Sequence, residues 1–308
     1  MPYLIINADD FGLTTGINRA VYEAQRSGVL RSAGLMSNAP GFDDAVAMAR
    51  EIGHRSLSVG CHVVLVDGKP ISPSGHIPSL LGGREIEGFR SHLRTFTMAA
   101  LSGQLNENEI ERETIAQITR IIDVGVAVSH IDTHKHTHWF PQVFRPIIRA
   151  ARICGVRAIR NPFPFAALPR SCGSHWWAQA KRCVKTRLLL AFRTEFMAEV
   201  RKNGLVTTNG SFGVFDSTMN DMGTIRVMLG MMGEGIWELV CHPGYNDEAL
   251  SKVRTTLRDS RDRERRLLVS PDFRATLNTH GIELINYFDA YHIRVGDVQA
   301  AGVSRVGI

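Results

Sequence analysis

The chain has no long hydrophobic run. None of its 308 residues lies in a stretch of about 18 or more consecutive apolar residues, so we expect no membrane-spanning helix. The first apolar segment begins at residue 3, which leaves no room for a signal peptide, and we expect none. A content of 44% hydrophobic and 21% charged residues is ordinary for a soluble globular protein.

Cysteine is scarce and shows no pairing pattern. The five cysteines are an odd number, they are scattered, and no two of them form a Cys-x-x-Cys pair. This pattern indicates reduced thiols rather than a disulfide framework. We therefore predict a cytoplasmic protein.

Sequence signatures of several large enzyme classes are also missing. The chain has no Gly-x-Ser-x-Gly nucleophile elbow, no Walker phosphate-binding loop and no dinucleotide-binding glycine fingerprint. The formal net charge of +6 permits attraction to an anionic surface without identifying one. The basic residues are not interleaved with aromatic residues as in known nucleic-acid-binding modules, so we expect no nucleic-acid partner.

Histidine, in contrast, is concentrated in one place. Four of the twelve histidines lie in the segment His130-Ile-Asp-Thr-His-Lys-His-Thr-His138. Imidazole is the commonest transition-metal ligand and titrates near neutral pH, so we interpret the segment as a metal or proton-transfer site; the alternative is a polar strand end. If the segment is an extended strand, its even-numbered residues share one face: His130, Asp132, His134, His136 and His138.

Two adjacent carboxylates form the second notable feature. Apolar residues at 3–6 are followed by Asn7-Ala-Asp9-Asp10-Phe-Gly12. We predict a buried strand of a parallel sheet that ends at the two aspartates, where ligands bind in α/β folds. Neighbouring side chains on a strand point to opposite faces of the sheet, so both carboxylates can have the same role only if the chain turns there. The alternative, a helix cap, accounts for one aspartate only.

Short apolar runs alternate with helical patterns along the chain. Such alternation indicates a parallel sheet, and seven or eight units favour an α/β fold built as a distorted (β/α) barrel like the TIM barrel; a doubly wound open sheet is the alternative. The predicted strands are 3–8, 31–37, 57–65, 127–134, 156–160, 205–208, 236–241 and 282–287. The predicted helices are 15–28, 42–53, 107–123, 142–154, 221–233 and 256–279.

We expect a single barrel domain over 1–290 with two insertions. The first, about 66–100, is rich in proline and glycine, and we predict a long loop beside the ligand site. The second, about 161–203, starts as a proline-rich turn and continues into a basic helical stretch over 176–202. The C-terminal tail over 291–308 has no clear pattern.

Two further histidines stand where predicted strands end. His62 interrupts an apolar run, and His242 follows another apolar run and precedes a Pro-Gly turn. In a barrel these positions converge on one face with the two aspartates and the histidine-rich segment. Two histidines and one carboxylate form a usual catalytic metal site. With a carboxylate that accepts a proton and a histidine that donates one, such a site suits metal-assisted amide hydrolysis.

These motifs together resemble the YdjC-like carbohydrate deacetylases, a family that includes chitooligosaccharide deacetylases. The resemblance covers residues 3 to about 290. It implies a distorted (β/α) barrel, one divalent metal ion, zinc or magnesium, and removal of acetyl groups from N-acetylated sugars. The motifs that carry it lie at 7–12 (Asn-Ala-Asp-Asp-Phe-Gly), 60–62 (Gly-Cys-His), 130–138 with Pro141, and 242–244 (His-Pro-Gly).

The resemblance also implies roles for single residues. Three of them match the metal ligands: Asp10, His62 and His134. Asp9 matches the general base, and His242 matches the general acid. Three more are predicted to contact the substrate or to orient the ligands: His136, Asp132 and Arg160.

Looser matches resemble one branch of this family, the HpnK-like deacetylases of hopanoid biosynthesis. They lie at 35–40 (Leu-Met-Ser-Asn-Ala-Pro), 64–70 (Val-Leu-Val-Asp-Gly-Lys-Pro) and 209–213 (Asn-Gly-Ser-Phe-Gly). The branch implies a hopanoid lipid that carries N-acetylglucosamine as the substrate. The alternatives are a soluble chitooligosaccharide, a metallo-phosphoesterase with two metals, and a catalytically inactive binding protein.

A lipid-linked sugar would give the basic stretch over 176–202 a role. A basic helix that carries tryptophan and leucine can lie on an anionic membrane surface; the alternative is a helix that covers the barrel with a solvated charged face. We therefore expect an N-acetylated amino-sugar conjugate as the partner, with peripheral membrane contact through 176–202 as a further prediction.

Overall fold

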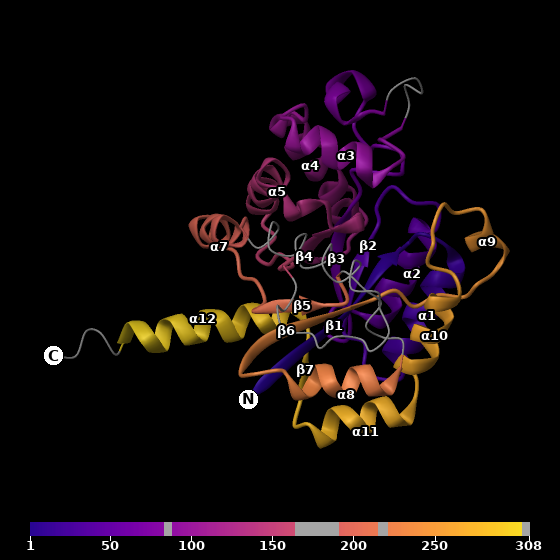
Figure 1. The fold of residues 1–308 in the computed structure, drawn as a ribbon, viewed down its shortest axis with the longest axis vertical. Helices are drawn as coiled ribbons and strands as arrows, with labels where there is room; N and C mark the ends of the chain where they lie inside the picture. Colours follow the sequence, from indigo (N-terminus) through magenta and orange to yellow (C-terminus); the bar gives the residue numbers. More distant parts are fainter. Residues whose placement is uncertain (83–87, 164–190, 215–220, 304–308) are drawn as a thin grey trace, which may run out of the picture.

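The computed structural model of the chain describes residues 1–82, 88–163, 191–214 and 221–303 (Figure 1). Their strands form one curled parallel sheet in the order β4-β3-β2-β1-β6-β5, and β7 pairs with the start of β1. The strands are β1 (Pro2–Phe11), β2 (Ser32–Leu35), β3 (Ser58–Val63), β4 (Val128–Thr133), β5 (Gly210–Phe212), β6 (Gly235–Cys241) and β7 (Glu283–Ile285).

Single bridges connect the two edges of this sheet. Ile131 of β4 bridges to Ile159, and the adjacent Ala158 bridges to Val206, from where the chain runs into β5. The sheet therefore curls into a distorted barrel, in agreement with the α/β fold expected from the sequence.

The regular strands predicted at 156–160 and 205–208 are absent from this part of the described chain, where only the single bridges pair the backbone. Side chains replace the missing ladder hydrogen bonds. The Thr207 hydroxyl donates to the carbonyl of Ile159, and the Asn161 amide donates to the carbonyl of Thr208. β5 begins beyond the predicted range.

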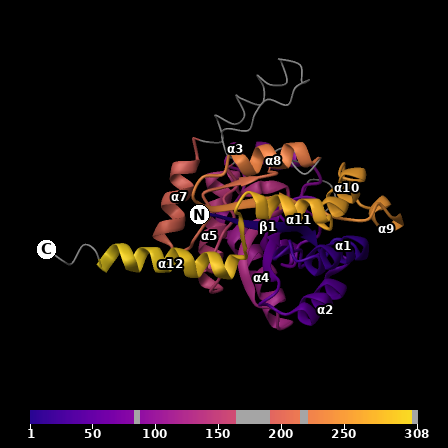
Figure 2. The same ribbon diagram turned by 90° about the horizontal axis from the view of Figure 1, so that it is seen from below.

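Helices lie outside the sheet (Figures 1 and 2). Five agree with predicted helices within a few residues: α1 (Thr15–Arg26), α2 (Phe42–Ile52), α4 (Glu107–Asp123), α5 (Pro141–Ile153) and α8 (Met222–Gly230). Two lie in the expected insertions: α3 (Leu93–Leu101) and α7 (Arg193–Lys202). Four follow β6 or β7: α9 (Glu248–Ser251), α10 (Asp259–Leu268), α11 (Pro271–Thr279) and α12 (Tyr287–Val303).

Three predictions of local structure are wrong. The expected helix over 256–279 is two helices, because Pro271 has no N–H to continue a helix and Ser270 caps α11 by accepting the N–H of Phe273. The expected loop over 66–100 contains α3 besides two short 3-10 turns. The tail expected to lack a pattern from about 291 continues α12 to residue 303.

β1 lies in the middle of the sheet and is buried on both faces from Leu4 onward. Leu4 belongs to the core between the sheet and the helices, whereas Ile5 belongs to a small cluster with Tyr287 of α12. Because side chains alternate along a strand, Asn7 and Asp9 lie on the same face as Ile5. The interior of the barrel is therefore apolar at one end and polar at the other.

The start of α12 closes the apolar end, which we call the floor. Tyr287 packs there against Ile5, Ile236, Ile285 and Ala290. Beyond these contacts α12 projects away from the body of the molecule in both views (Figures 1 and 2).

Candidate active site

The ends of several strands meet at the opposite end of the barrel, which we call the mouth. β1 carries Asp9 and Asp10, β3 carries His62, His134 directly follows β4, and His242 directly follows β6. All five line one pocket of about 650 Å³. The convergence predicted from the positions of these residues in the sequence is confirmed.

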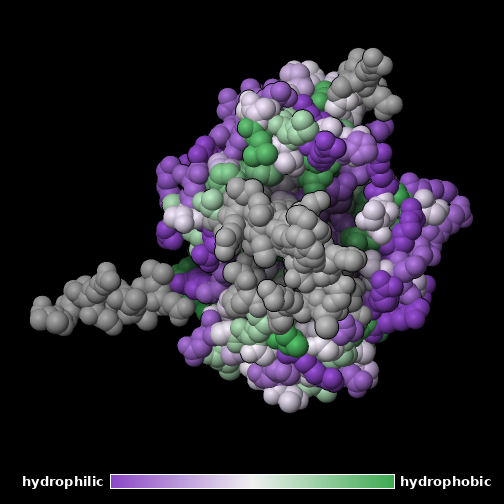
Figure 3. All heavy atoms as spheres, in the orientation of Figure 1, coloured by the Kyte–Doolittle hydropathy of each residue, from purple (hydrophilic) through white to green (hydrophobic). Residues whose placement is uncertain are grey.

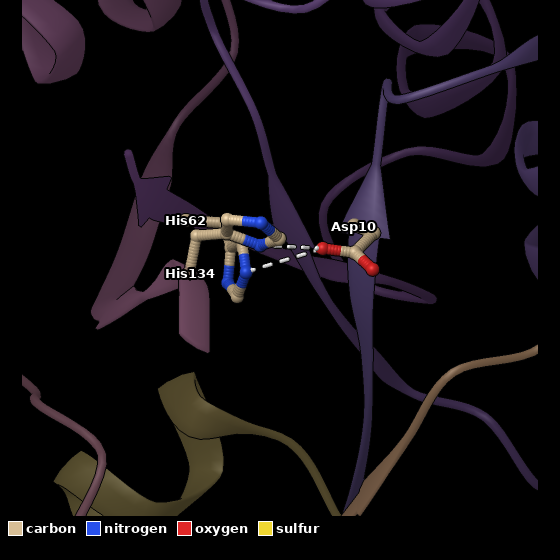
Figure 4. A group of neighbouring side chains, drawn as sticks. All are labelled: Asp10, His62 and His134. Atoms are coloured by element: carbon tan, nitrogen blue, oxygen red, sulfur yellow. Dashed lines mark hydrogen bonds and ion pairs between the residues drawn. The ribbon is translucent and has the colours of Figure 1, made fainter. Parts of the chain in front are cut away.

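Asp10, His62 and His134 form a compact triad (Figure 4). The Oδ1 atom of Asp10 lies 3.0 Å from Nδ1 of His134 and 3.5 Å from Nε2 of His62. One candidate ligand atom from each residue lies within 4.8 Å of the other two. A carboxylate and two imidazoles at these separations can hold a divalent metal ion.

Left-handed backbone conformations gather around this pocket. Asp10 has a φ of 63°, so the chain turns after Asp9 and both carboxylates reach the pocket. Asp67, Lys135 and His136 have φ values of 59°, 55° and 51° and also line it. These four are the non-glycine residues with positive φ in the described chain. Such conformations are rare without glycine, and they cluster at functional sites.

The aspartates do not cap the first helix. The hydroxyl of Thr14 accepts the N–H of Ile17 and caps α1. The alternative of a helix cap therefore does not apply to either aspartate, and both line the pocket.

The strand predicted at 127–134 is present as β4, but the histidine-rich segment is not extended beyond it, so its even-numbered residues do not share one face. β4 ends at Thr133, and His134–Trp139 form an irregular turn. The left-handed φ values of Lys135 and His136 cause this turn, because extended backbone requires negative φ. Only the first part of the segment continues the barrel wall.

The four histidines consequently separate. His134 and His136 line the pocket, whereas His130 lies at the floor, stacked on Tyr287 with ring centroids 3.8 Å apart. His138 is buried against Thr133. Burial lowers the pKa of His130 and that of His138 to about 3, so both are neutral.

A network of buried charged side chains lies between the mouth and the floor and contacts the residues of the pocket. Arg160 donates from Nη1 to Asp9 Oδ2 at 2.8 Å and from Nη2 to Asp9 Oδ1 at 2.6 Å. Its Nη2 also lies 2.7 Å from Asp132 Oδ2, and Asp132 Oδ1 lies 2.9 Å from His62 Nδ1. Arg160 therefore fixes Asp9, and Asp132 orients His62.

The protonation of the triad follows from these neighbours. Burial would lower the pKa of His62, but the carboxylates of Asp132 and Asp9 outweigh burial and raise it to about 10. For Asp10, burial opposes ionisation, yet Arg261 and His134 hold its pKa well below the usual range. Burial lowers the pKa of His134. Because imidazole binds a metal in its neutral form, a bound ion must displace the proton of His62.

Space for the network comes from two glycines. A Cβ atom on Gly34 would lie 3.0 Å from Asp132 Oδ1 and 3.1 Å from His62 Nδ1. On Gly60 it would lie 2.4 Å from the ring of His130. Side chains at these two positions would displace the histidines or the aspartate.

Sequence reasoning missed the acid below Arg160. Glu238 of β6 accepts from Arg160 Nε at 2.9 Å and from the hydroxyl of Tyr287 at 2.7 Å, and all three side chains are buried. Burial raises the pKa of Glu238. A lone glutamate in the apolar run Ile236-Trp-Glu-Leu-Val240 was a signal that this strand faces a polar interior.

Sequence reasoning also missed two residues of α10. Arg261 forms an ion pair with Asp10, and Glu264 accepts the backbone N–H of His242. Both are buried. Their helix reads Asp-Ser-Arg-Asp-Arg-Glu-Arg-Arg over 259–266, which indicates a solvated charged face, so the sequence held no signal that distinguished them.

Comparison with known proteins places the chain in a family over a range that includes the candidate site residues. A family model described as YdjC-like protein matches residues 3–279. The chain belongs to the YdjC-like family. Two curated relatives of this YdjC-like chain, each 30% identical to it, are carbohydrate deacetylases. The protein of Brevibacillus brevis is covered over 98% of its length by 92% of this chain. The protein of Geobacillus stearothermophilus is covered over 100% of its length by 95% of this chain.

A solved structure shares the fold of this YdjC-like chain. It comes from Enterococcus faecalis V583 and is provisionally named as a cellobiose-phosphate cleavage protein. It is 26% identical, with a TM-score of 0.72 over 94% of this chain and 98% of that one. These comparisons support the family and the fold, and they do not single out the hopanoid-linked branch.

Proposed function

We propose that this YdjC-like protein is a metal-dependent hydrolase that removes the acetyl group from an N-acetylated amino sugar. The observation that carries the proposal is the triad of Asp10, His62 and His134 in one pocket with Asp9 and His242. The two curated relatives are carbohydrate deacetylases, and this chain matches them over nearly their whole length, which supports the substrate class. We propose 1–290 as the catalytic domain.

The donor set fits one divalent ion held by Asp10, His62 and His134. The low pKa of Asp10 keeps its carboxylate ionised, and the lowered pKa of His134 keeps its imidazole neutral. When bound, such an ion lowers the pKa of a coordinated water and polarises the acyl carbonyl. Two imidazoles and a carboxylate suit zinc, with magnesium as the alternative.

Asp9 and His242 are the proposed proton carriers. Arg160 holds both oxygens of Asp9, so this carboxylate is fixed in position to accept the proton of the attacking water. His242 Nε2 lies 3.8 Å from Asp9 Oδ2. As general acid, His242 protonates the amine when the C–N bond breaks.

The geometry disfavours a two-metal phosphoesterase. Asp9, His62 and Asp132 are also close enough to hold an ion. However, the guanidinium of Arg160 already pairs with both carboxylates, at 2.6 Å from Asp9 and 2.7 Å from Asp132. A second metal ion would meet this fixed positive charge in a buried environment, where repulsion is poorly screened.

For the substrate, we propose a hopanoid lipid that carries N-acetylglucosamine. Each of the three segments that resemble the hopanoid-linked branch contributes one pocket residue: Met36, Asp67 and Gly213. Several apolar side chains also line the pocket and could contact a lipid: Leu13, Met36, Leu93, Trp139, Val214, Val253 and Leu257. A soluble chitooligosaccharide is the alternative substrate.

Membrane contact through 176–202 stays a prediction, because most of that stretch, with Trp176 and Trp177, lies outside the described residues. In the part of the chain that the structure describes, no helix has the length and apolar character needed to cross a bilayer. On the face shown in Figure 3, the visible hydrophobic side chains of the described residues form small separate groups.

The deciding experiment measures acetate release from N-acetylglucosaminyl-hopanoid and from chitobiose, with metal-stripped and metal-restored protein. Metal-dependent release from the lipid alone supports the hopanoid proposal. Release from chitobiose instead moves the substrate to the soluble-sugar class. If neither substrate releases acetate while metal is bound, the deacetylase proposal is wrong.

A further inference from the structure

Two buried polar atoms on pocket-lining residues have no hydrogen-bond partner within the described chain. They are Nη1 of Arg261 and Nδ1 of His136. The other buried atoms of this kind belong to residues that do not line the pocket. A buried donor without a partner is costly, most of all on a charged side chain, so such an atom in a pocket points to a ligand.

The guanidinium of Arg261 is held firmly while Nη1 stays unpaired. Its Nη2 pairs with Asp10 Oδ2, and its Nε donates to the carbonyl of Leu257 at 3.2 Å. The stem packs beneath the turn after β6, where a Cβ on Gly244 would lie 3.0 Å from Arg261 Cδ. The side chain is 1% exposed. A fixed fork of this kind loses little freedom when it binds an oxygen.

The position of Arg261 relates its free nitrogen to the triad. Asp10 presents Oδ1 to the two imidazoles and Oδ2 to Arg261. The guanidinium and a metal ion would therefore share this carboxylate from opposite oxygens. In the described chain no carboxylate besides Asp10 pairs with Arg261, whereas Arg160 pairs with three. Its positive charge is thus available to a second anionic group in the pocket.

We propose that Arg261 is a further catalytic residue, which donates from Nη1 to the acyl oxygen of the substrate; this inference rests on the proposed function. When water adds to the acyl carbon, the carbonyl oxygen gains negative charge, and a preorganised guanidinium stabilises that charge. The C–N bond then breaks, the amine takes a proton from His242, and the acyl group leaves as acetate. Acetate retains the same oxygen, so it also binds Arg261.

Acetate binding to cobalt-loaded protein tests this proposal without turnover. Arg261→Lys keeps a positive charge near Asp10 but lacks the second nitrogen of the fork. We expect acetate affinity to fall by about tenfold or more, as the loss of a charge-assisted hydrogen bond implies, and cobalt affinity to change little. With a hydrolysed N-acetyl sugar, kcat should fall by about 10²–10³-fold with little change in KM.

Arg265→Lys is the matched control, because Arg265 lies on the same helix and pairs with Asp262 and Glu23 outside the pocket. Its acetate and cobalt affinities should equal those of the wild type. Arg261→Met is a second variant that preserves the packing of the stem, and it should lose acetate binding as well. Thermal unfolding of all variants checks that they fold.

The possible results separate the proposals. Unchanged acetate affinity in Arg261→Lys overturns the role of Arg261, and so does a parallel fall in cobalt and acetate affinity, which would make it only a brace for Asp10. If Arg261-dependent acetate binding is found but no acetylated sugar is hydrolysed, the deacetylase proposal fails and the oxyanion site stands. If neither variant folds, a crystal structure of cobalt-loaded wild type with acetate decides: an acetate oxygen on Nη1 supports the role, and acetate elsewhere overturns it.

Discussion

The mouth of the barrel is polar and its floor is largely apolar, yet the same histidine-rich segment supplies a side chain to each. His130 and His134 belong to one histidine-rich segment, but His130 lies on a regular strand, stacked on Tyr287, and His134 lies in a left-handed turn against Asp10. The non-glycine residues with positive φ in the described chain all line the pocket at the mouth. Residue type alone therefore does not distinguish a structural histidine from one at the candidate site; its position relative to the pocket does.

The sharpest test of this contrast replaces the two histidines separately. His134→Ala should lose metal binding and reduce turnover to the level of metal-stripped protein, because the triad loses a ligand. His130→Ala, the control at the floor, should retain metal and kcat and lose about 1–3 kcal/mol of unfolding free energy. Metal content and urea unfolding measure both. Full metal binding by His134→Ala would show that the triad is not the metal site.

Within the mouth, Asp9 and Asp10 should differ in the same way. Asp9→Asn should keep metal and lose turnover by about 10²–10⁴-fold, the usual contribution of a general base. Asp10→Asn should lose metal. Steady-state kinetics and metal analysis of both variants separate the two roles. If Asp9→Asn has full activity, its assignment as the base is wrong.

Acid should destabilise the protein through its buried neutral histidines. His130 and His138 have a pKa of about 3 in the folded chain, below the usual value of about 6.5 in an unfolded chain. Their stabilising contribution is complete above about pH 6.5. Well below that pH the unfolded chain binds two protons at these two histidines that the folded chain excludes, and this pair contributes a decrease of about 2.7 kcal/mol per pH unit to the free energy of unfolding.

Urea unfolding of metal-stripped protein between about pH 6.5 and 5 measures this slope. His130→Asn should reduce the slope by about 1.4 kcal/mol per pH unit, because the proton uptake of one buried neutral histidine is removed. His54→Asn, at an exposed position, should leave the slope unchanged. An equal slope in wild type and His130→Asn would contradict the burial argument.

The smallest expected effect concerns the floor. Tyr287→Phe removes the hydroxyl that donates to Glu238 and leaves the ring stacked on His130. We expect a loss of about 1 kcal/mol of unfolding free energy, the net value of one hydrogen bond, with kcat and metal affinity preserved. A large loss of kcat would mean that the network below Arg160 acts on Asp9 and that floor and mouth are coupled.

Much of the site could be predicted because it follows strand ends. Asp9, Asp10 and His242 each stand where an apolar run stops, and His62 lies in the last part of a predicted strand; parallel strands place such positions at one end of a barrel. The Ser-Pro pair at 270–271 likewise marked a helix boundary in the sequence, although the prediction ran through it.

Other features depend on contacts between distant residues. Lys135 and His136 turn without glycine, which local preference does not indicate. Arg261 reaches Asp10 across 251 positions of sequence from a helix that reads as solvated. Such a residue is recognisable only when the whole barrel is assembled.

The central place of β1 has a consequence for how the protein is made. β1 pairs with β2 nearby in sequence, but Leu4 also pairs with Leu284 and Trp237. During synthesis β1 can therefore complete its pairing only after β6 and β7 have been made, and its unpaired apolar edge stays exposed until then. Long-range parallel pairing of this kind folds slowly and favours aggregation. We expect this chain to depend on chaperones during translation more than a helical protein of equal length.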